Sequence, residues 1–415
     1  MADEKKIYLD YNATTPLEPE VVQVITDSLT EAWGNPSSSH DAGIKAKKVI
    51  DDARQNVAKM IGAKPTDIIF TSGGTEANNM ILHTAIKYFS TYHHICNGHP
   101  GGDNQDKLPH IITSNLEHDS VKLVLEHLAE EGIASVTFVP ASSLTGHVDV
   151  EDILSTVRPT TCMITIMLAN NETGVLQPIK LISEKVKHLN LSRKQLPQIL
   201  LHTDAAQAIG KIEVDVEDLG VDYLTIVGHK FYAPRIGAVY VRDLGSKDIP
   251  LYPMLYGGGQ ERNIRPGTEN TCMIAGLGKA SELVAKHLQS YNSHMTSVRD
   301  YLENRLQETF GDKVHFNGKF SNSERLPNTC NVSILGHNLP GYIILSHCKV
   351  LQASIGAACH SQNRPSPILL AIGIPECTAR NALRLSIGRE TTLEDIDSVI
   401  KDLQQAIEVI ESADN

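Results

Sequence analysis

The sequence predicts an α/β protein, with a large domain built on a mainly parallel sheet flanked by helices and a smaller α+β domain. Two observations predict this fold. Short apolar runs alternate with amphipathic stretches through the first two-thirds of the 415 residues, as in right-handed strand–helix–strand units. After about residue 290 the pattern changes to helices with few strands, which indicates the second domain.

The strands of the large domain are expected where short segments are apolar on both faces, since a sheet covered on each side needs such strands. These segments are residues 67–71, 110–114, 135–139, 162–168, 198–203, 222–227 and 237–241. Amphipathic residues 121–131 and 181–189 predict helices that cover the sheet. Residues 44–61 predict an earlier helix that ends at Gly62.

The C-terminal part contains two more strand-like segments, residues 330–334 and 383–387. Thr391 and Glu394 predict a capping box that opens a last helix near Leu393. A chain of this length can bury two cores. We therefore expect a large domain of residues 16–285 and a small domain of residues 1–15 and 286–415.

The composition excludes some function classes. With 37 basic and 49 acidic residues the net charge is −12, which argues against a nucleic-acid or anionic-membrane surface. The start, MADEKKIYLD, is charged, and no run reaches about 18 apolar residues, so the cytosol is the expected location. Seven scattered cysteines without a C-x-x-C pair predict free thiols.

Residues 91–110 form a polar segment rich in glycine and histidine that predicts a surface insertion. Its residues His93, His94, Cys96 and His99 resemble metal ligands. No second cluster completes a site, so no metal is expected.

The stretch FTSGGTEANN, residues 70–79, predicts a strand end, a glycine turn and a helix start. At Gly73, Gly74 and Thr75 backbone N–H groups and the positive end of the helix dipole would hold a phosphate. The glycine spacing is neither a P-loop nor a dinucleotide fingerprint, and such a turn can also merely cap a helix.

Further polar residues follow other predicted strands: His118 in NLEHDS, Asn171 in LANNETG, Asp204 and Gln207 in HTDAAQ, and Lys230 in GHK. Each alone has a bland interpretation as a core histidine, a turn former, an N-cap or a snorkelling lysine. Together they meet where strands of one sheet end, the place where ligands bind in open α/β sheets. A phosphate cradle, an acid and a lysine amine predict a pyridoxal phosphate pocket.

Eight ordered motifs carry a family resemblance: YLDYNATTP, TSGGTEANN, EH at 117–118, NNETG, HTDAAQ, GHK, RPGTEN at 265–270 and GAACHS at 356–361. With them the chain resembles the cysteine desulfurase and selenocysteine lyase family, within the class-V aminotransferases, from about residue 7 to about residue 405. The resemblance implies the pyridoxal-phosphate-dependent transferase fold type I and a homodimer with composite active sites.

The resemblance also implies roles for single residues. Lys230 is the lysine joined to the cofactor aldehyde, Asp204 the partner of the pyridinium nitrogen, and His118 the ring stacked on the cofactor. Cys359 is the acceptor of sulfur or selenium, although a buried inert cysteine is the usual interpretation of a thiol. Further cofactor and substrate contacts are implied for Gly74, Thr75, Asn171, Gln207, His229, Thr268 of the other subunit, and Arg384, which grips the substrate carboxylate.

Three departures bear on the element transferred. Asp119 stands where cysteine desulfurases usually have Lys, Val227 where they have Ser, and His360 where Thr or Ser is common. Since a selenol is more acidic than a thiol, a site without help for deprotonation disfavours cysteine. We interpret the departures as typical of the selenium branch, with Asp119 near the substrate, L-selenocysteine as substrate, and L-alanine and selenide as products.

Three alternatives stay open at this point. A cysteine desulfurase that supplies iron–sulfur clusters or thiolation is the nearest one, and a selenium acceptor protein is a possible partner in either case. A thiol hydrolase using Cys359 and His360 would need two sequence neighbours to meet in nucleophile–base geometry. A non-catalytic scaffold would be colourless.

Overall fold

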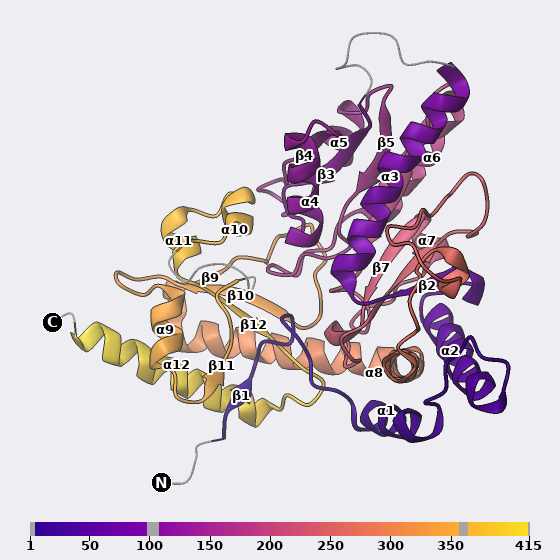
Figure 1. Cartoon of the computed structure of the whole chain (residues 1–415). Helices are drawn as coiled ribbons and strands as arrows, with labels where there is room; N and C mark the ends of the chain where they lie inside the picture. The colour runs from indigo at the N-terminus through magenta and orange to yellow at the C-terminus, as the bar shows by residue number, and fades with distance from the viewer. Residues whose placement is uncertain (1–4, 98–107, 357–363, 414–415) are drawn as a thin grey trace.

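The computed structural model describes residues 5–97, 108–356 and 364–413. Its largest sheet has seven strands and lies in the upper part of the view in Figure 1. Its strand order is β2-β8-β7-β6-β5-β3-β4. Only β8 runs antiparallel to its neighbours, so the mainly parallel sheet is confirmed. The strands fall on the seven predicted segments: β2 (Ile68–Thr71), β3 (His110–Ser114), β4 (Ser135–Val139), β5 (Thr161–Thr165), β6 (Leu200–Asp204), β7 (Tyr223–Val227) and β8 (Gly237–Val241).

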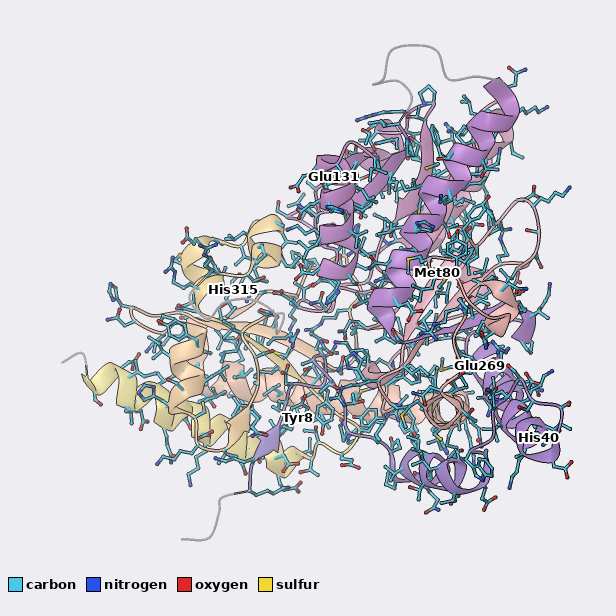
Figure 2. The ribbon with its side chains drawn as sticks, in the orientation of Figure 1. Tyr8, His40, Met80, Glu131, Glu269 and His315 are labelled. Carbon is cyan, nitrogen blue, oxygen red and sulfur yellow. The ribbon has the colours of Figure 1, made fainter. Side chains whose placement is uncertain are left out.

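Helices cover both faces of this sheet. Successive strand residues point to opposite sides, and since both sets are apolar, each face needs a covering layer. Ile68 and Phe70 of β2 belong to a core with α2 (Asp41–Met60), α6 (Ile179–Ser192) and α8 (Thr271–Phe310). Ile69 belongs to a second core with α3 (Gly74–Asn97) and α4 (Asp119–Glu130). Met80 lies on the inner side of α3, among the side chains that fill this layer (Figure 2).

A second region has its own buried cluster, around the antiparallel sheet β12-β10-β9. The domain boundary stays a prediction, which this separate core supports. The proposed boundary after residue 285 falls inside α8, a 40-residue helix that contributes to both cores. The remaining elements are α1 (Pro19–Glu31), α5 (Val150–Ser155), α7 (Val216–Leu219), α9 (Gly341–His347), α10 (Pro367–Ala371), α11 (Glu376–Arg380), α12 (Leu393–Ala413), β1 (Ile7–Tyr8), β9 (Val314–Phe316), β10 (Thr329–Ile334), β11 (Leu351–Gln352) and β12 (Ala382–Ser386).

The N-terminal segment joins the two regions. Strand β1 pairs with β11 beside the C-terminal elements (Figure 1). The chain then crosses to the end of β7, where the Thr15 amide donates to the His229 carbonyl at 2.9 Å. Between these points the Asn12 amide donates to Ser386 Oγ at 3.0 Å. Residues of YNATTP therefore close over the carboxyl end of the large sheet.

The predicted helix ends are partly right. Gly62 follows α2 with a φ of +68°, the left-handed conformation that glycine adopts easily. The capping box of α12 was placed one residue too early. Thr392 and Asp395 form it, with reciprocal hydrogen bonds of 3.1 Å, whereas Thr391 Oγ1 accepts from the Gly388 amide.

His202 on β6 makes the fold sensitive to acid. Its ring is fully buried between Thr165 and Thr225 hydroxyls, and burial lowers its pKa from 6.5 to about 4. As the pH falls, His202 takes up a proton in the unfolded chain before it does so in the folded chain. The folded state is therefore fully stable with respect to this group above pH 6.5, and it loses stability as the pH falls to about 4. The loss from this one group is on the order of 3 kcal/mol.

We expect denaturant unfolding of His202→Gln to depend less on pH between 7 and 4 than unfolding of the wild type. The exposed His347→Gln is the matched control and should keep the wild-type dependence. Equal pH dependence in all three proteins would contradict this account of His202.

Candidate active site

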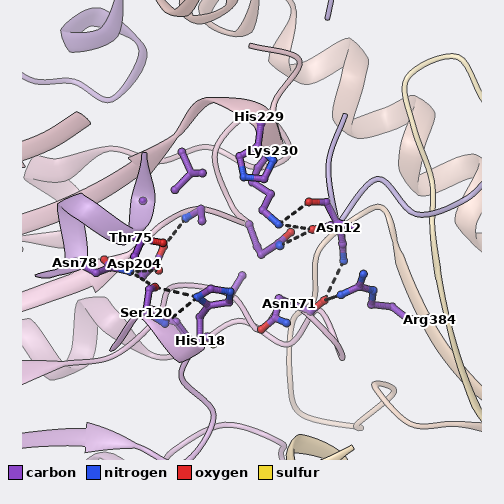
Figure 3. A pocket seen from close by; sticks show the side chains of 17 residues that line it. Asn12, Thr75, Asn78, His118, Ser120, Asn171, Asp204, His229, Lys230 and Arg384 are labelled. Atoms are coloured by element: carbon purple, nitrogen blue, oxygen red, sulfur yellow. Dashed lines mark hydrogen bonds between the residues drawn. The ribbon is translucent and has the colours of Figure 1, made fainter. Parts of the chain in front are cut away.

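A cavity of about 250 Å³ lies at the carboxyl ends of β2, β3, β5, β6 and β7 (Figure 3). Residues at the ends of five strands of one sheet converge there, as expected for an open α/β sheet. Its lining residues are Asn12, Ala13, Gly74, Thr75, Asn78, His118, Ser120, Met167, Ala169, Asn171, Asp204, Ala206, Gln207, Val227, His229, Lys230 and Arg384.

Lys230 enters the cavity from a single 3₁₀ turn, Gly228–Lys230, directly after β7. Its Nζ donates to the carbonyls of Asn12 at 2.7 Å and Ala13 at 2.9 Å. Two backbone acceptors from the N-terminal segment therefore hold a half-buried amine at the end of a buried strand (Figure 3). This arrangement differs from the snorkelling alternative, in which the amine would reach water.

Asp204 ends β6 and begins a chain of polar side chains across the cavity. Its Oδ1 accepts from the Ala206 amide and its Oδ2 from Asn78 Nδ2, both at 2.9 Å. Asn78 Nδ2 also donates to Ser120 Oγ, which lies 2.9 Å from His118 Nδ1 (Figure 3). The carboxylate is 7% exposed and keeps free lone pairs for a further donor.

The turn before α3 forms one side of the cavity lining. Helix α3 begins at Gly74, so its first N–H groups and its positive dipole end lie beside Thr75 in the lining. A Cβ on Gly74 would lie 2.5 Å from Val227 Cγ2, so a larger residue would force the Val227 side chain to shift. His229 lines the same cavity, and burial and the Lys230 charge lower its pKa to about 4, leaving the ring neutral near pH 7.

Arg384 lies on β12, in the second region around the sheet β12-β10-β9. Its side chain reaches the cavity, and the residue is 1% exposed. Its guanidinium contacts Asp10 Oδ1 at 2.7 Å and the Asn171 carbonyl at 3.2 Å. Arg384 therefore forms a structural salt bridge and also lines the cavity. Arg384 Nε has no hydrogen-bond partner in the described structure, although it is buried.

The Asp10–Arg384 pair predicts a large effect on stability. Asp10→Ala would leave a buried guanidinium without its carboxylate, which costs about 3–5 kcal/mol in the free energy of unfolding. Asp10→Asn keeps an acceptor and should cost less. The control Asp243→Ala breaks an exposed pair with Lys64 and should cost at most about 1 kcal/mol. Similar denaturation midpoints for both alanine variants would contradict this interpretation.

Glu117 does not line the cavity, but it precedes His118, which does. Its Oε1 accepts from Ser114 Oγ at 2.6 Å and from the Met167 amide at 3.0 Å, beside His118. Burial, with the nearby Asp204 charge, raises its pKa to about 8. Near neutral pH this residue is therefore a protonated carboxylic acid, and it adds no second negative charge beside Asp204.

Two predicted site residues lie outside this cavity. Thr268 is exposed and lines a separate surface hollow with Thr71, Ser72 and Arg235. Asp119 is the first residue of α4 and does not line the cavity, although it follows His118. Cys359 and His360 lie outside the described residues.

The possible metal ligands His93, His94, Cys96 and His99 lie outside the described side chains. In the described part of the chain, no group of three or more His, Cys, Asp or Glu side chains could hold a metal ion. Cys162, Cys272, Cys330, Cys348 and Cys377 are free.

The sequence interpretation missed Asn12 and Asn78, both fully buried. Asn78 lies three residues after Thr75 on the same helix face, so helical spacing could have identified it. Asn12 lies in YNATTP, and its position beside Lys230 depends on a contact across 218 residues. No local pattern predicts such a contact.

The chain is similar to several known proteins. The family model described as aminotransferase class-V matches residues 7–399. Selenocysteine lyase of Homo sapiens is 59% identical over 98% of this chain and 93% of the relative, and that of Bos taurus is 59% identical over 99% and 95%. Cysteine desulfurase IscS of Dictyoglomus turgidum is 39% identical over 98% and 95%. A solved NifS-like protein superposes with a TM-score of 0.83 at 31% identity, over 97% of this chain and all of that one.

Proposed function

The chain belongs to the class-V aminotransferase family. Within this family we propose that it is a selenocysteine lyase. The reaction removes selenium from L-selenocysteine and leaves L-alanine. The observation that carries the proposal is the difference in identity, 59% to a selenocysteine lyase against 39% to a cysteine desulfurase over the same share of the chain.

Pyridoxal 5'-phosphate is the cofactor that we propose for the cavity, and the donor set fits it. The cavity offers a primary amine at Lys230, a carboxylate at Asp204 and a helix N-terminus at Gly74 and Thr75. These groups suit an aldehyde, a ring nitrogen and a phosphate. When bound, the cofactor supplies an electron sink for the α-carbon of the amino acid.

Lys230 has two roles in the proposed mechanism. Its Nζ would hold the cofactor aldehyde, and as a free amine the same Nζ would take the α-proton of the substrate. The carbonyls of Asn12 and Ala13 keep the amine at the cavity when it is not joined to the cofactor. Asp204 would keep the cofactor's ring nitrogen protonated, because an adjacent carboxylate favours the charged form.

Arg384 and Asn171 are the proposed substrate contacts. A guanidinium suits a carboxylate because its planar fork can donate two parallel hydrogen bonds. Asp10 already holds one nitrogen of Arg384 at 2.7 Å, so the arginine is oriented before substrate arrives. Asn170 Oδ1 accepts from the Glu172 and Thr173 amides and makes the turn, which leaves the Asn171 side chain for the cavity.

Cys359 is the proposed selenium acceptor. The Cys359 thiolate attacks selenium, so that an S–Se bond forms as the C–Se bond breaks. The bonding pair stays with the β-carbon, which takes up a proton to become the methyl group of alanine. Two equivalents of an external thiol then release selenide and become a disulfide. A selenium acceptor protein is a further possible partner. We also propose a homodimer in which Thr268 contacts the phosphate of the other subunit. The exposure of Thr268, and its place in a hollow separate from its own cavity, support this proposal.

The cytosol stays a prediction. No helix within residues 5–97, 108–356 and 364–413 combines the length and the apolar character that a membrane crossing requires.

A paired assay tests the proposed function. Purified enzyme with a thiol reductant receives L-selenocysteine or L-cysteine, and selenide, sulfide and alanine are measured. We expect rapid selenide release and alanine in equal amount, with slow sulfide release. Cys359→Ala should lower selenide release. Equal rates with both substrates would favour the cysteine desulfurase instead.

Asp119 predicts how the preference can be shifted. Asp119→Lys places a positive charge next to His118, which would stabilise a thiolate, so the ratio of sulfide to selenide release should rise about tenfold. Asp119→Asn is the matched control, because it removes the negative charge without adding a positive one. An unchanged ratio in Asp119→Lys would contradict a role for this position in selectivity.

A further inference from the structure

Lys211 is a buried lysine next to the cavity, and the proposed mechanism does not use it. It lies four residues after Gln207 in the turn that follows β6 and is 4% exposed. Its Nζ donates to Gln207 Oε1 at 2.8 Å and to Asn12 Oδ1 at 3.2 Å. Both acceptors are neutral amide oxygens, and both residues line the cavity.

The hydrogen bonds of Lys211 match a neutral amine. A neutral amine has two N–H groups, and two acceptors receive them. A protonated amine would bring a third N–H and a buried charge without a carboxylate among these partners, which is costly. Burial lowers the pKa of Lys211 well below its ordinary value, and the charges of Lys230, Arg384 and Arg389 act in the same direction.

Two further contacts decide how the amides of Asn12 and Gln207 are turned. Asn328 Nδ2 donates to Asn12 Oδ1 at 3.0 Å, so the oxygen of Asn12 faces Lys211. Gln207 Nε2 donates to the Asn12 carbonyl at 3.0 Å, and a flipped amide would bring two oxygens together there. The amide NH₂ of Gln207 has two N–H groups, and the bond to the Asn12 carbonyl uses one of them.

We propose that Lys211 is a positioning residue: by holding Gln207 Oε1, it makes Gln207 present an N–H donor, rather than an oxygen, to an acceptor oxygen of the bound ligand. The inference rests on the proposed function, because that ligand is taken to be pyridoxal phosphate, whose ring oxygen is such an acceptor. Without Lys211 the Gln207 oxygen loses its donor, and of these two contacts only the bond to the Asn12 carbonyl still holds the amide.

The test compares holoenzyme variants by two readouts other than turnover. One is the rate at which pyridoxal phosphate is lost on dilution, and the other is the pH titration of the visible absorption band. We expect Lys211→Met to retain the cofactor about tenfold less well, the order of one lost hydrogen bond to a charged acceptor. The pKa of the visible band should rise. Without the N–H of Gln207 the ring oxygen is a stronger base, so the proton whose loss changes the band is held more strongly.

A double-mutant cycle separates positioning from a general structural role. Gln207→Met should give the same two changes, and Lys211→Met combined with Gln207→Met should be no worse than Gln207→Met alone. The control Lys286→Met removes an exposed lysine and should behave as wild type. Additive effects, or an unchanged band in Lys211→Met, would overturn the proposal.

Gln207→Glu tests the same point if Lys211→Met does not fold. A carboxylate at 207 pairs with Lys211 but has no N–H, so it should lose the cofactor as readily as Gln207→Met. Wild-type retention in Gln207→Glu would mean that an oxygen faces the ligand, against the proposal. A wild-type protein without any visible band would instead defeat the proposed function itself.

Discussion

Lys230→Ala should abolish selenide release, with a fall of at least about a thousandfold, because one amine provides both the covalent attachment and the proton acceptor. The purified variant should also lack the stable visible band. The fold should survive, since the Asn12 carbonyl still accepts from Gln207 Nε2 at 3.0 Å. The measurements are the paired selenide and sulfide assay, the absorption spectrum and the denaturation midpoint.

Two controls separate the chemistry from charge and packing. Lys230→Arg keeps a cation and N–H donors for the carbonyls of Asn12 and Ala13, yet it should be as inactive as the alanine variant. The exposed Lys247→Ala should have wild-type activity. If Lys230→Ala kept more than about a tenth of the activity, a thiol hydrolase would explain the chain better than a lysine-dependent lyase.

Asp204→Asn should lower kcat by about a hundredfold to ten-thousandfold, the range expected when a charge that develops in the reaction loses its partner. An amide cannot favour a protonated ring nitrogen as a carboxylate does. Because Lys230 is untouched, the visible band should remain. The loss should therefore appear in kcat with the cofactor still attached.

The control for Asp204→Asn is another aspartate that accepts backbone hydrogen bonds. Asp215 caps α7 by accepting from the Glu217 and Asp218 amides. Asp215→Asn should change stability by about 1 kcal/mol at most and leave kcat unchanged. A wild-type kcat in Asp204→Asn would show that the carboxylate serves only as a structural acceptor for Asn78 and the Ala206 amide.

The sheet was predictable because its strands are apolar on both faces and long enough to be recognised as apolar runs in the sequence. Strands β1, β9 and β11 have two or three residues, too few for any periodic signal. Helix α8, with 40 residues, was not predicted as an element, and it contains glycines, which usually indicate a break. In the structure Gly276 and Gly278 are needed there, since a Cβ at either would meet Ile25 or Ala53 within 2.8 Å.

The site was predictable to the extent that its residues follow strands. Asp204 is the last residue of β6, and His118, Asn171 and Lys230 follow strands within a short loop. The parallel sheet therefore brings these residues to one edge. Asn12 and Lys211 have no such signal. They meet because the N-terminal segment returns to the end of β7, a contact that only the folded chain reveals.

The measurement that tests the central claim most directly is mass spectrometry of the protein after borohydride treatment and proteolysis. Reduction fixes the cofactor to the amine that holds it. The account predicts one pyridoxal phosphate adduct, on the peptide that contains Lys230, and none on the peptide that contains Lys211. An adduct on another side chain, or no adduct at all, would contradict it.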